Sequence, residues 1–276
     1  MAIIRLPESV TPLEIALPPE VVSMDTVSPE RQEWLWDSRI PLGALTLLDG
    51  SANVGKSTLM IDLAARLTTG RPMPFSSAEP LEPMNVLFLT AEDSLEKTFS
   101  QRLRATECDL SRVKVWVGRY EKDPEGNVAL NGYIALDSHY QDLERIIREH
   151  KIGLVVIDVL FAYLGDVNPY EDKAARGLLT PLHHIADRNN CAIVAIRHPR
   201  KGQSGESALE SGGGSLGFTN ACRSVLRVDR HPELDGVAVI APVKINIAKS
   251  DGLAHTYQLV ECLDPDGYSY AAKVEW

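Results

Sequence analysis

The sequence lacks a hydrophobic run long enough to cross a lipid bilayer. Its longest apolar stretch, Leu154 to Leu164, is interrupted by Asp158, whereas a membrane-spanning helix needs about 20 predominantly apolar residues. The start of the chain also lacks the basic start, long apolar run and small-residue cleavage site of a secretory signal. We therefore expect a cytoplasmic protein without a membrane partner.

Cysteine and net positive charge are also scarce. The four cysteines have no C-x-x-C spacing, so neither a zinc site nor a disulfide framework is indicated, and a reducing compartment fits. A net charge of -10 and a pI of about 5.2 argue against a protein that coats nucleic acid through its overall charge. This balance still allows a local basic groove.

Residues 1–30 differ in composition from the rest of the chain. They contain five prolines and five acidic residues without a sustained hydrophobic period, which predicts an extended N-terminal arm. The chain as a whole is 44% hydrophobic, enough for one globular core. We predict that residues 31–276 form a single catalytic domain.

The most specific motif runs from Gly50 to Ser57 and matches the phosphate-binding P-loop pattern G-x-x-x-x-G-K-[ST] at every fixed position. The apolar residues 44–48 precede it as a buried strand would, and apolar residues follow it at helical spacing until Gly70. Such a loop turns backbone amides toward phosphate oxygens. The predicted ATP contacts are Gly50, Ser51, Ala52, Asn53, Val54, Gly55, Lys56, Ser57 and Thr58.

Further apolar segments are typical of buried strands, at residues 85–90, 154–158 and 191–196. Helical stretches lie between them, including one at about residues 171–189. The alternation predicts an α/β fold with a doubly wound, mainly parallel sheet and helices on both faces. Later segments, near residues 224–228, 237–243 and 257–260, are expected to add C-terminal antiparallel hairpins.

Two acidic residues are predicted to begin helices. Asp93 and Glu96 have the spacing of a capping box, and Asp137 can cap the helix that follows it. Residues 123–132 are rich in turn formers and are expected to form an insertion.

Three polar residues stand where predicted strands end. Glu92 follows the segment at 85–90, Asp158 ends its own strand, and His198 follows the segment at 191–196. Because ligands of such sheets bind at the carboxyl ends of strands, these side chains are expected near the P-loop.

Phosphoryl transfer from ATP offers a role to each of these residues. Lys56 would contact the β- and γ-phosphates, while Ser57 and Asp158 would hold Mg²⁺. Glu92 would orient and activate the attacking water. His198 is either part of this hydrolytic site or a satisfied polar residue at a strand end, and both interpretations stay open.

Residues 199–214 are rich in Gly and Ser and long enough to form a mobile functional loop. Arg200 and Lys201 open this loop. Two cations there either form a solvated turn or contact a nucleic-acid backbone, and the sequence leaves both possibilities open.

Motifs spread over about residues 33–250 resemble the RepA-like branch of the RecA-fold ATPases, which occur in plasmids, phages and bacterial genomes. Besides the P-loop they are Trp34-Leu35-Trp36, Arg39 to Gly43, Leu89 to Asp93, Val155 to Asp158, Arg197-His198-Pro199, Gly212 to Phe218, Arg223 to Leu226 and Ala241 to Lys244. The resemblance implies a RecA-like fold and a hexameric ring with ATP between subunits, as in plasmid replicative DNA helicases.

The resemblance also implies residue roles. Glu92 matches the catalytic glutamate, and His198 matches the residue that senses the γ-phosphate and relays its state to a DNA-contacting loop. Arg223 matches the arginine finger donated by a neighbouring subunit, whose charge stabilises the transition state. Lys244 is a weaker candidate for a second cation supplied in trans.

Two positions depart from the family pattern. Asn53 stands where the family commonly has glycine, and asparagine tolerates the left-handed backbone of such loops better than most residues. Glu210 and Ser211 stand where relatives often carry an arginine, so one presumed phosphate or DNA contact is missing.

The leading hypothesis is a hexameric, Mg²⁺-dependent ATPase that acts as a helicase-like motor on single-stranded or forked DNA. The first alternative is a recombination or repair enzyme that processes forks or branches, with or without nuclease activity, although no separate acidic metal cluster supports a nuclease site. The second is a nucleotide-dependent regulatory or assembly ATPase without a DNA substrate, which the acidic net charge allows.

Overall fold

The computed structural model describes residues 21–76, 79–91, 93–122, 128–132, 134–198, 216–263 and 270–276. The chain divides into two compact units, Met1–Arg31 and Gln32–Trp276. In the first unit the described residues include one short 3-10 helix, η1 (Met24–Thr26), and their side chains are exposed. The other elements belong to the second unit.

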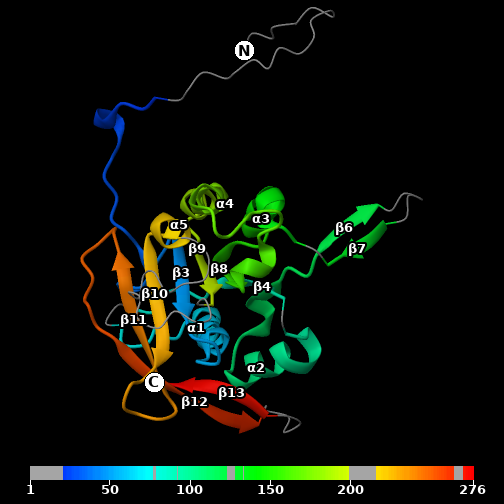
Figure 1. The fold of residues 1–276 in the computed structure, drawn as a ribbon, viewed down its shortest axis with the longest axis vertical. Helices are drawn as coiled ribbons and strands as arrows, with labels where there is room; N and C mark the ends of the chain where they lie inside the picture. Colours follow the sequence, from blue (N-terminus) through cyan, green and yellow to red (C-terminus); the bar gives the residue numbers. More distant parts are fainter. Residues whose placement is uncertain are drawn as a thin grey trace, which may run out of the picture. The chain divides into compact units, whose positions relative to one another are not determined.

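A nine-stranded sheet runs through the second unit in the order β13-β12-β11-β10-β3-β9-β8-β4-β5 (Figure 1). The strands from β10 to β5 are parallel to one another, and β11, β12 and β13 are antiparallel to their neighbours. The predicted mainly parallel sheet with C-terminal antiparallel hairpins is confirmed. The strand bounds are β3 (Leu45–Gly50), β4 (Asn85–Thr90), β5 (Val113–Val115), β8 (Ile152–Asp158), β9 (Ala192–Arg197), β10 (Ser224–Arg230), β11 (Val237–Ile245), β12 (His255–Leu263) and β13 (Tyr270–Glu275).

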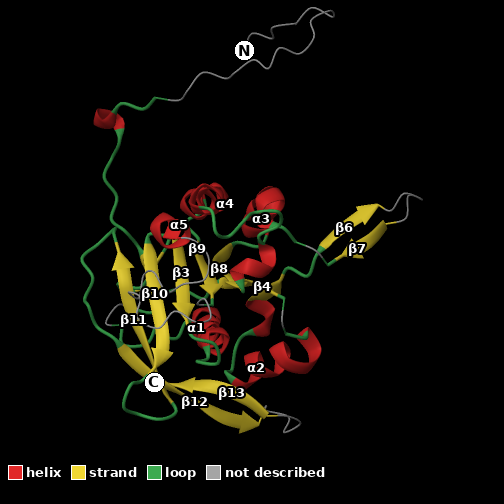
Figure 2. Cartoon of the chain, viewed as in Figure 1, coloured by secondary structure: helices red, strands yellow, loops and turns green. Residues whose placement is uncertain are grey.

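Helices cover both faces of this sheet (Figure 2). On one face lie α1 (Lys56–Thr69) and α2 (Ser100–Ala105), and on the other lie α3 (Leu136–Glu149), α4 (Asp172–Arg188) and α5 (Leu216–Ala221). Consecutive strand residues point into the two hydrophobic cores on opposite faces of the sheet. Leu47 packs in the core with α3 and α4, and Leu48 packs in the core with α1. Short helical turns complete the connections: η2 (Leu95–Phe99), η3 (Leu110–Arg112) and η4 (Leu160–Tyr163).

The β12–β13 hairpin packs against α1 and α2. It lies below these two helices in Figure 1. Trp276 Nε1 donates a hydrogen bond to Asp62 Oδ2 on α1 at 2.8 Å, and Tyr257 and Val274 join the core around α1. The hairpin therefore places β12 beside the helix that begins at the P-loop.

Two small ribbons lie outside the main sheet. One consists of β1 (Trp34–Trp36) and β2 (Ile40–Pro41), and the other of β6 (Arg119–Lys122) and β7 (Val128–Asn131). Of the predicted turn-rich insertion at residues 123–132, residues 123–127 lie outside the described residues. The prediction is wrong for Val128–Asn131, which form β7 and pair with β6.

The predicted helix cap at Asp93 is wrong. Ser94 is the N-cap of η2, since its Oγ accepts a hydrogen bond from Lys97 N at 3.2 Å. Asp93 instead forms an ion pair with Arg102 at 2.7 Å. The carboxylate has a cationic partner nine positions away, which the spacing of a capping box does not reveal.

The predicted cap at Asp137 is also wrong. The N-cap of α3 is Ala135, and Asp137 lies inside the first turn of the helix. Its Oδ2 accepts a hydrogen bond from Asp166 N at 3.2 Å. Asp137 therefore holds the segment after η4 against the start of α3.

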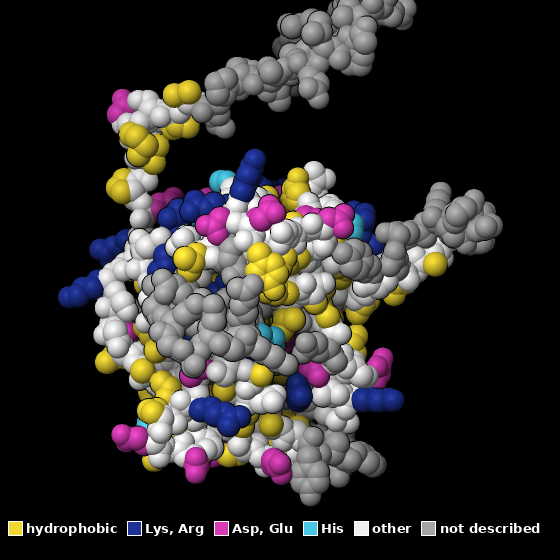
Figure 3. Space-filling view, viewed as in Figure 1, with side chains coloured by type: hydrophobic (Ala, Val, Ile, Leu, Met, Phe, Trp, Pro, Cys, Tyr) yellow, Lys and Arg dark blue, Asp and Glu magenta, His cyan; other side chains and the backbone are white. Residues whose placement is uncertain are grey.

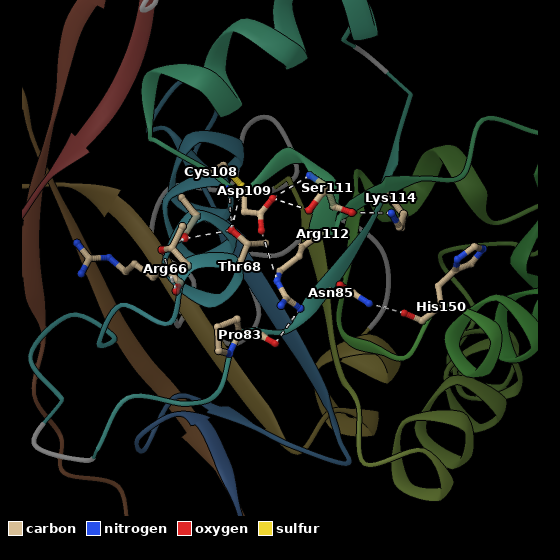
Figure 4. Close-up of polar contacts among 12 residues, drawn as sticks. Arg66, Thr68, Pro83, Asn85, Cys108, Asp109, Ser111, Arg112, Lys114 and His150 are labelled. Carbon is tan, nitrogen blue, oxygen red and sulfur yellow. Dashed lines mark hydrogen bonds and ion pairs between the residues drawn. The ribbon is translucent and has the colours of Figure 1, made fainter.

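Side-chain contacts hold the segment before β5 against the end of α1 (Figure 4). Thr68 Oγ1 lies 3.2 Å from Cys108 Sγ and accepts a hydrogen bond from Asp109 N at 3.3 Å. Arg112 Nη1 donates to Pro83 O at 3.2 Å. Burial raises the pKa of Cys108, which is typical of a structural thiol.

The surface carries charges of both signs. On the face shown in Figure 3, acidic and basic side chains are interspersed over the described part of the surface. None of the helices among the described residues combines the length and apolarity that a membrane crossing requires.

Candidate active site

The P-loop between β3 and α1 depends on glycine at two close approaches. A Cβ at Gly50 would overlap Val228 O on the neighbouring strand β10. Gly55, the N-cap of α1, has φ 86°, and a Cβ there would lie 2.7 Å from Leu259 Cδ1. Asn53 has φ 60°, a left-handed conformation that asparagine adopts readily, so the loop forms without the usual glycine at this position.

Lys56 is folded back over the loop. Its Nζ donates to the carbonyl oxygens of Gly50 and Ser51, both at 2.7 Å, and the residue is 4% exposed. Burial lowers the pKa of Lys56 to about 8, although the nearby Asp158 acts in the opposite direction. A phosphate in the loop would offer this ammonium charged acceptors, which bind it more strongly than the two carbonyls.

ATP affinity is expected to fall as the pH rises through about 8, because deprotonation of Lys56 removes the charge that attracts phosphate. Between about pH 7 and pH 9 the Kd of a nonhydrolysable ATP analogue should rise about tenfold. Calorimetric titration measures the change, with Lys56→Arg as a control that stays charged. A wild-type Kd that is constant over this range would contradict the assignment.

Asp158 and Ser57 provide oxygen donors next to Lys56. Asp158 ends β8, opposite Thr90 of β4, and Ser57 lies in the first turn of α1. Both line the same cavity as Lys56. A hydroxyl and a carboxylate are ligands that suit Mg²⁺, which takes its other ligands from phosphates and water. Over the described ranges, no group of three or more His, Cys, Asp or Glu side chains forms a separate metal site.

The cavity at the P-loop has a volume of about 400 Å³. His198, directly after β9, lines it together with the Asp93–Arg102 ion pair. The apolar residues Leu259 of β12 and Ala272 of β13 form another part of its wall. A cavity with a phosphate loop, charged groups and an apolar wall fits a nucleoside triphosphate.

The loop has two supports that the sequence did not predict. Tyr257 Oη donates to Val54 O at 2.7 Å, and burial raises the pKa of Tyr257. Asp229 accepts from Ser51 Oγ at 2.6 Å and from Ser51 N at 3.3 Å. Burial alone would raise the pKa of Asp229, but hydrogen bonds from Arg227 and Ser51 lower it overall. No local pattern marks these supports, since they lie 203 and 178 residues from the groups that they bind.

Some predicted site residues lie outside the described residues, namely Glu92, Arg200 and Lys201. Beside Glu92, Ala91 N donates to Asp158 O at 3.3 Å, so the chain at the end of β4 is joined to the end of β8. Seven of the predicted site residues line one cavity: Asn53, Gly55, Lys56, Ser57, Thr58, Asp158 and His198. The predicted ATP contacts Gly50, Ser51, Ala52 and Val54 are not part of its lining.

Arg223 lies where the parallel strands begin, at the end of the sheet opposite to its own P-loop. It precedes β10, whose first residue Ser224 pairs with Thr46 near the start of β3, whereas the P-loop follows the end of β3. Arg223 is exposed, while Lys244 Nζ donates to carbonyl oxygens in the last turn of α5 at 2.9 and 3.0 Å. Neither cation lines the cavity of its own chain as far as the structure describes it.

Comparisons with known proteins identify a family and a similar fold. A family model described as AAA_25, AAA domain, matches residues 11–204. The DNA repair protein RadA of Listeria monocytogenes is 25% identical over 198 residues, which cover 71% of this chain and 36% of RadA. The chain thus spans about a third of the length of this curated relative. The crystal structure of the RadB recombinase superposes with a TM-score of 0.52 at 17% identity, over 86% of this chain and 93% of RadB.

Proposed function

Because the chain belongs to the AAA_25 family of AAA domains, we propose that it hydrolyses ATP with Mg²⁺ and acts as a helicase-like motor on single-stranded DNA. The family match and the RecA-like fold shared with RadB support the ATPase. We further propose that the chain forms a hexameric ring, acts as a helicase and belongs to the RepA-like branch.

The observation that carries the proposal is the meeting of the P-loop, Asp158 and His198 at one cavity, at the carboxyl ends of β3, β8 and β9. When ATP enters, Lys56 Nζ exchanges the two loop carbonyls for β- and γ-phosphate oxygens, and the loop amides donate to the same phosphates. Ser57 and Asp158 would hold Mg²⁺, which neutralises charge that develops on the phosphates.

The remaining steps involve residues whose roles come from sequence. Glu92 orients the attacking water and accepts its proton. His198 contacts the γ-phosphate from its place in the cavity and relays hydrolysis to the segment that follows it. Arg223 of a neighbouring subunit enters the cavity and stabilises the transition state. Its position at the opposite edge of the sheet supports action between chains rather than within one.

A DNA substrate is supported by the names of the relatives. RadA is described as a DNA repair protein and RadB as a recombinase. These names also favour a second candidate, a recombination or repair ATPase that processes forked or branched DNA. In either case Arg200 and Lys201 are proposed to contact the DNA backbone.

Single-stranded DNA is expected to raise the rate of ATP turnover several-fold, because the segment after His198 would respond to DNA and to the γ-phosphate together. Phosphate release with single-stranded, forked and duplex oligonucleotides measures the effect. His198→Ala should still bind ATP but lose the stimulation. Stronger stimulation by forked DNA would favour the repair candidate, whereas turnover that no DNA changes would favour a regulatory ATPase without a DNA substrate.

A further inference from the structure

A buried ion pair joins the strand that carries the P-loop to the strand that carries His198. Asp49 directly precedes Gly50, Arg197 directly precedes His198, and the two are register partners on β3 and β9, which are neighbours in Figure 1. Arg197 Nε donates to Asp49 Oδ1 at 2.7 Å, and Nη2 donates to Oδ2 at 2.5 Å. Each residue is 1% exposed. This bidentate geometry fixes the ends of the two strands relative to each other.

The same guanidinium also binds α5. Its Nη2 donates to Thr219 Oγ1 at 3.1 Å, and Arg197 Cζ lies 5.9 Å from the centre of the Phe218 ring. Along the chain, α5 begins directly after the Gly- and Ser-rich segment that follows His198. Arg197 therefore contacts the elements at both ends of that segment, since it precedes the segment and binds the helix that follows it.

Two adjacent residues at the end of β9 contact different parts of the protein. Arg197 binds α5, whereas His198 lines the ATP cavity. Neighbouring residues of a strand point to opposite faces and share one backbone. A displacement of α5 that moves Arg197 is thus expected to move His198, and through Asp49 it also acts on the start of the P-loop.

We propose that Asp49 and Arg197 are positioning residues that hold the P-loop, His198 and α5 together as one unit during ATP hydrolysis. The inference rests on the proposed ATPase function and adds to it a route between the ATP cavity and the segment proposed to contact DNA. Neither residue lines the ATP cavity over the described ranges, so both act through their neighbours.

A single substitution cannot distinguish positioning from stability. Loss of either partner leaves an unpaired charge in the core and destabilises the protein whatever the role of the pair. Replacement of both partners by apolar side chains of similar volume removes that charge, and often leaves stability unchanged or higher. The double variant Asp49→Leu with Arg197→Met therefore separates the two roles.

The double variant is expected to unfold within a few degrees of the wild type and to turn over ATP at least about tenfold more slowly, with a KM changed less than about twofold. Thr219→Val keeps the ion pair and removes the hydroxyl of α5 that accepts a hydrogen bond from Arg197, and is expected to lose most of the stimulation by single-stranded DNA.

Arg39→Met serves as the control, because Arg39 is a 3% exposed arginine that does not line the cavity. It should lower the unfolding temperature and leave the kcat of the folded protein unchanged.

A folded double variant with the kcat of the wild type would overturn the inference and leave the proposed ATPase intact. If the double variant does not fold, Thr219→Val decides, and full DNA stimulation in that variant would overturn the inference. Wild-type protein that hydrolyses no ATP would overturn the proposed function, and the positioning role with it.

Discussion

Replacement of Lys56 with alanine is expected to weaken ATP binding by at least about 100-fold, because two charge-assisted hydrogen bonds to phosphate are lost. The ammonium already lies within the loop, where Nζ donates to Gly50 O and Ser51 O at 2.7 Å. No other lysine lines the described cavity. Calorimetric titration with a nonhydrolysable ATP analogue and Mg²⁺ measures the loss.

Lys114→Ala provides a matched control for this experiment. Lys114 Nζ also donates to a backbone carbonyl, that of Ser111 at 2.7 Å, but on strand β5 at the far edge of the sheet. The control variant should bind the analogue as the wild type does. Lys56→Ala with a Kd within about threefold of the wild type would show that phosphates do not bind in this loop.

The second large effect is expected at Glu92. Glu92→Gln should bind ATP normally and hydrolyse it at least about 100-fold more slowly, because the amide cannot accept the proton of the attacking water. Phosphate release and analogue binding, measured on the same preparation, separate the two steps. Turnover at the wild-type rate would exclude Glu92 as the catalytic base.

Arg223→Ala should lose turnover to a similar extent if the arginine acts in a neighbouring active site. In a mixture of Arg223→Ala and Glu92→Gln chains, some interfaces would pair an intact Glu92 with an intact Arg223. Partial recovery of turnover is therefore expected. Mixed assemblies without recovery would contradict the sharing of sites between subunits.

Much of the fold could be predicted from the sequence because its signals are local. The apolar runs of β3, β8 and β9 bury both faces of each strand, and the P-loop motif identified the junction of β3 and α1. The mainly parallel sheet then placed Asp158 and His198 at the carboxyl ends of their strands, where the structure has them.

The rest of the cavity depends on tertiary packing. Leu259 and Ala272 reach the cavity because the β12–β13 hairpin packs against α1, and hydrophobic alternation within a hairpin does not say where the hairpin packs. The pairing of Asp49 with Arg197 requires β3 and β9 to be neighbours, although they are distant in sequence. The prediction that Asp93 caps a helix was wrong because Asp93 pairs with Arg102, a contact that the spacing of a capping box does not reveal.

ATP hydrolysis at the P-loop between β3 and α1 is tested most directly by the steady-state release of inorganic phosphate from ATP with Mg²⁺, measured for the wild type and Lys56→Ala purified in parallel. We predict release proportional to the wild-type concentration and none above background for Lys56→Ala. Equal release by the two proteins, or none by the wild type, would contradict ATP hydrolysis at this loop.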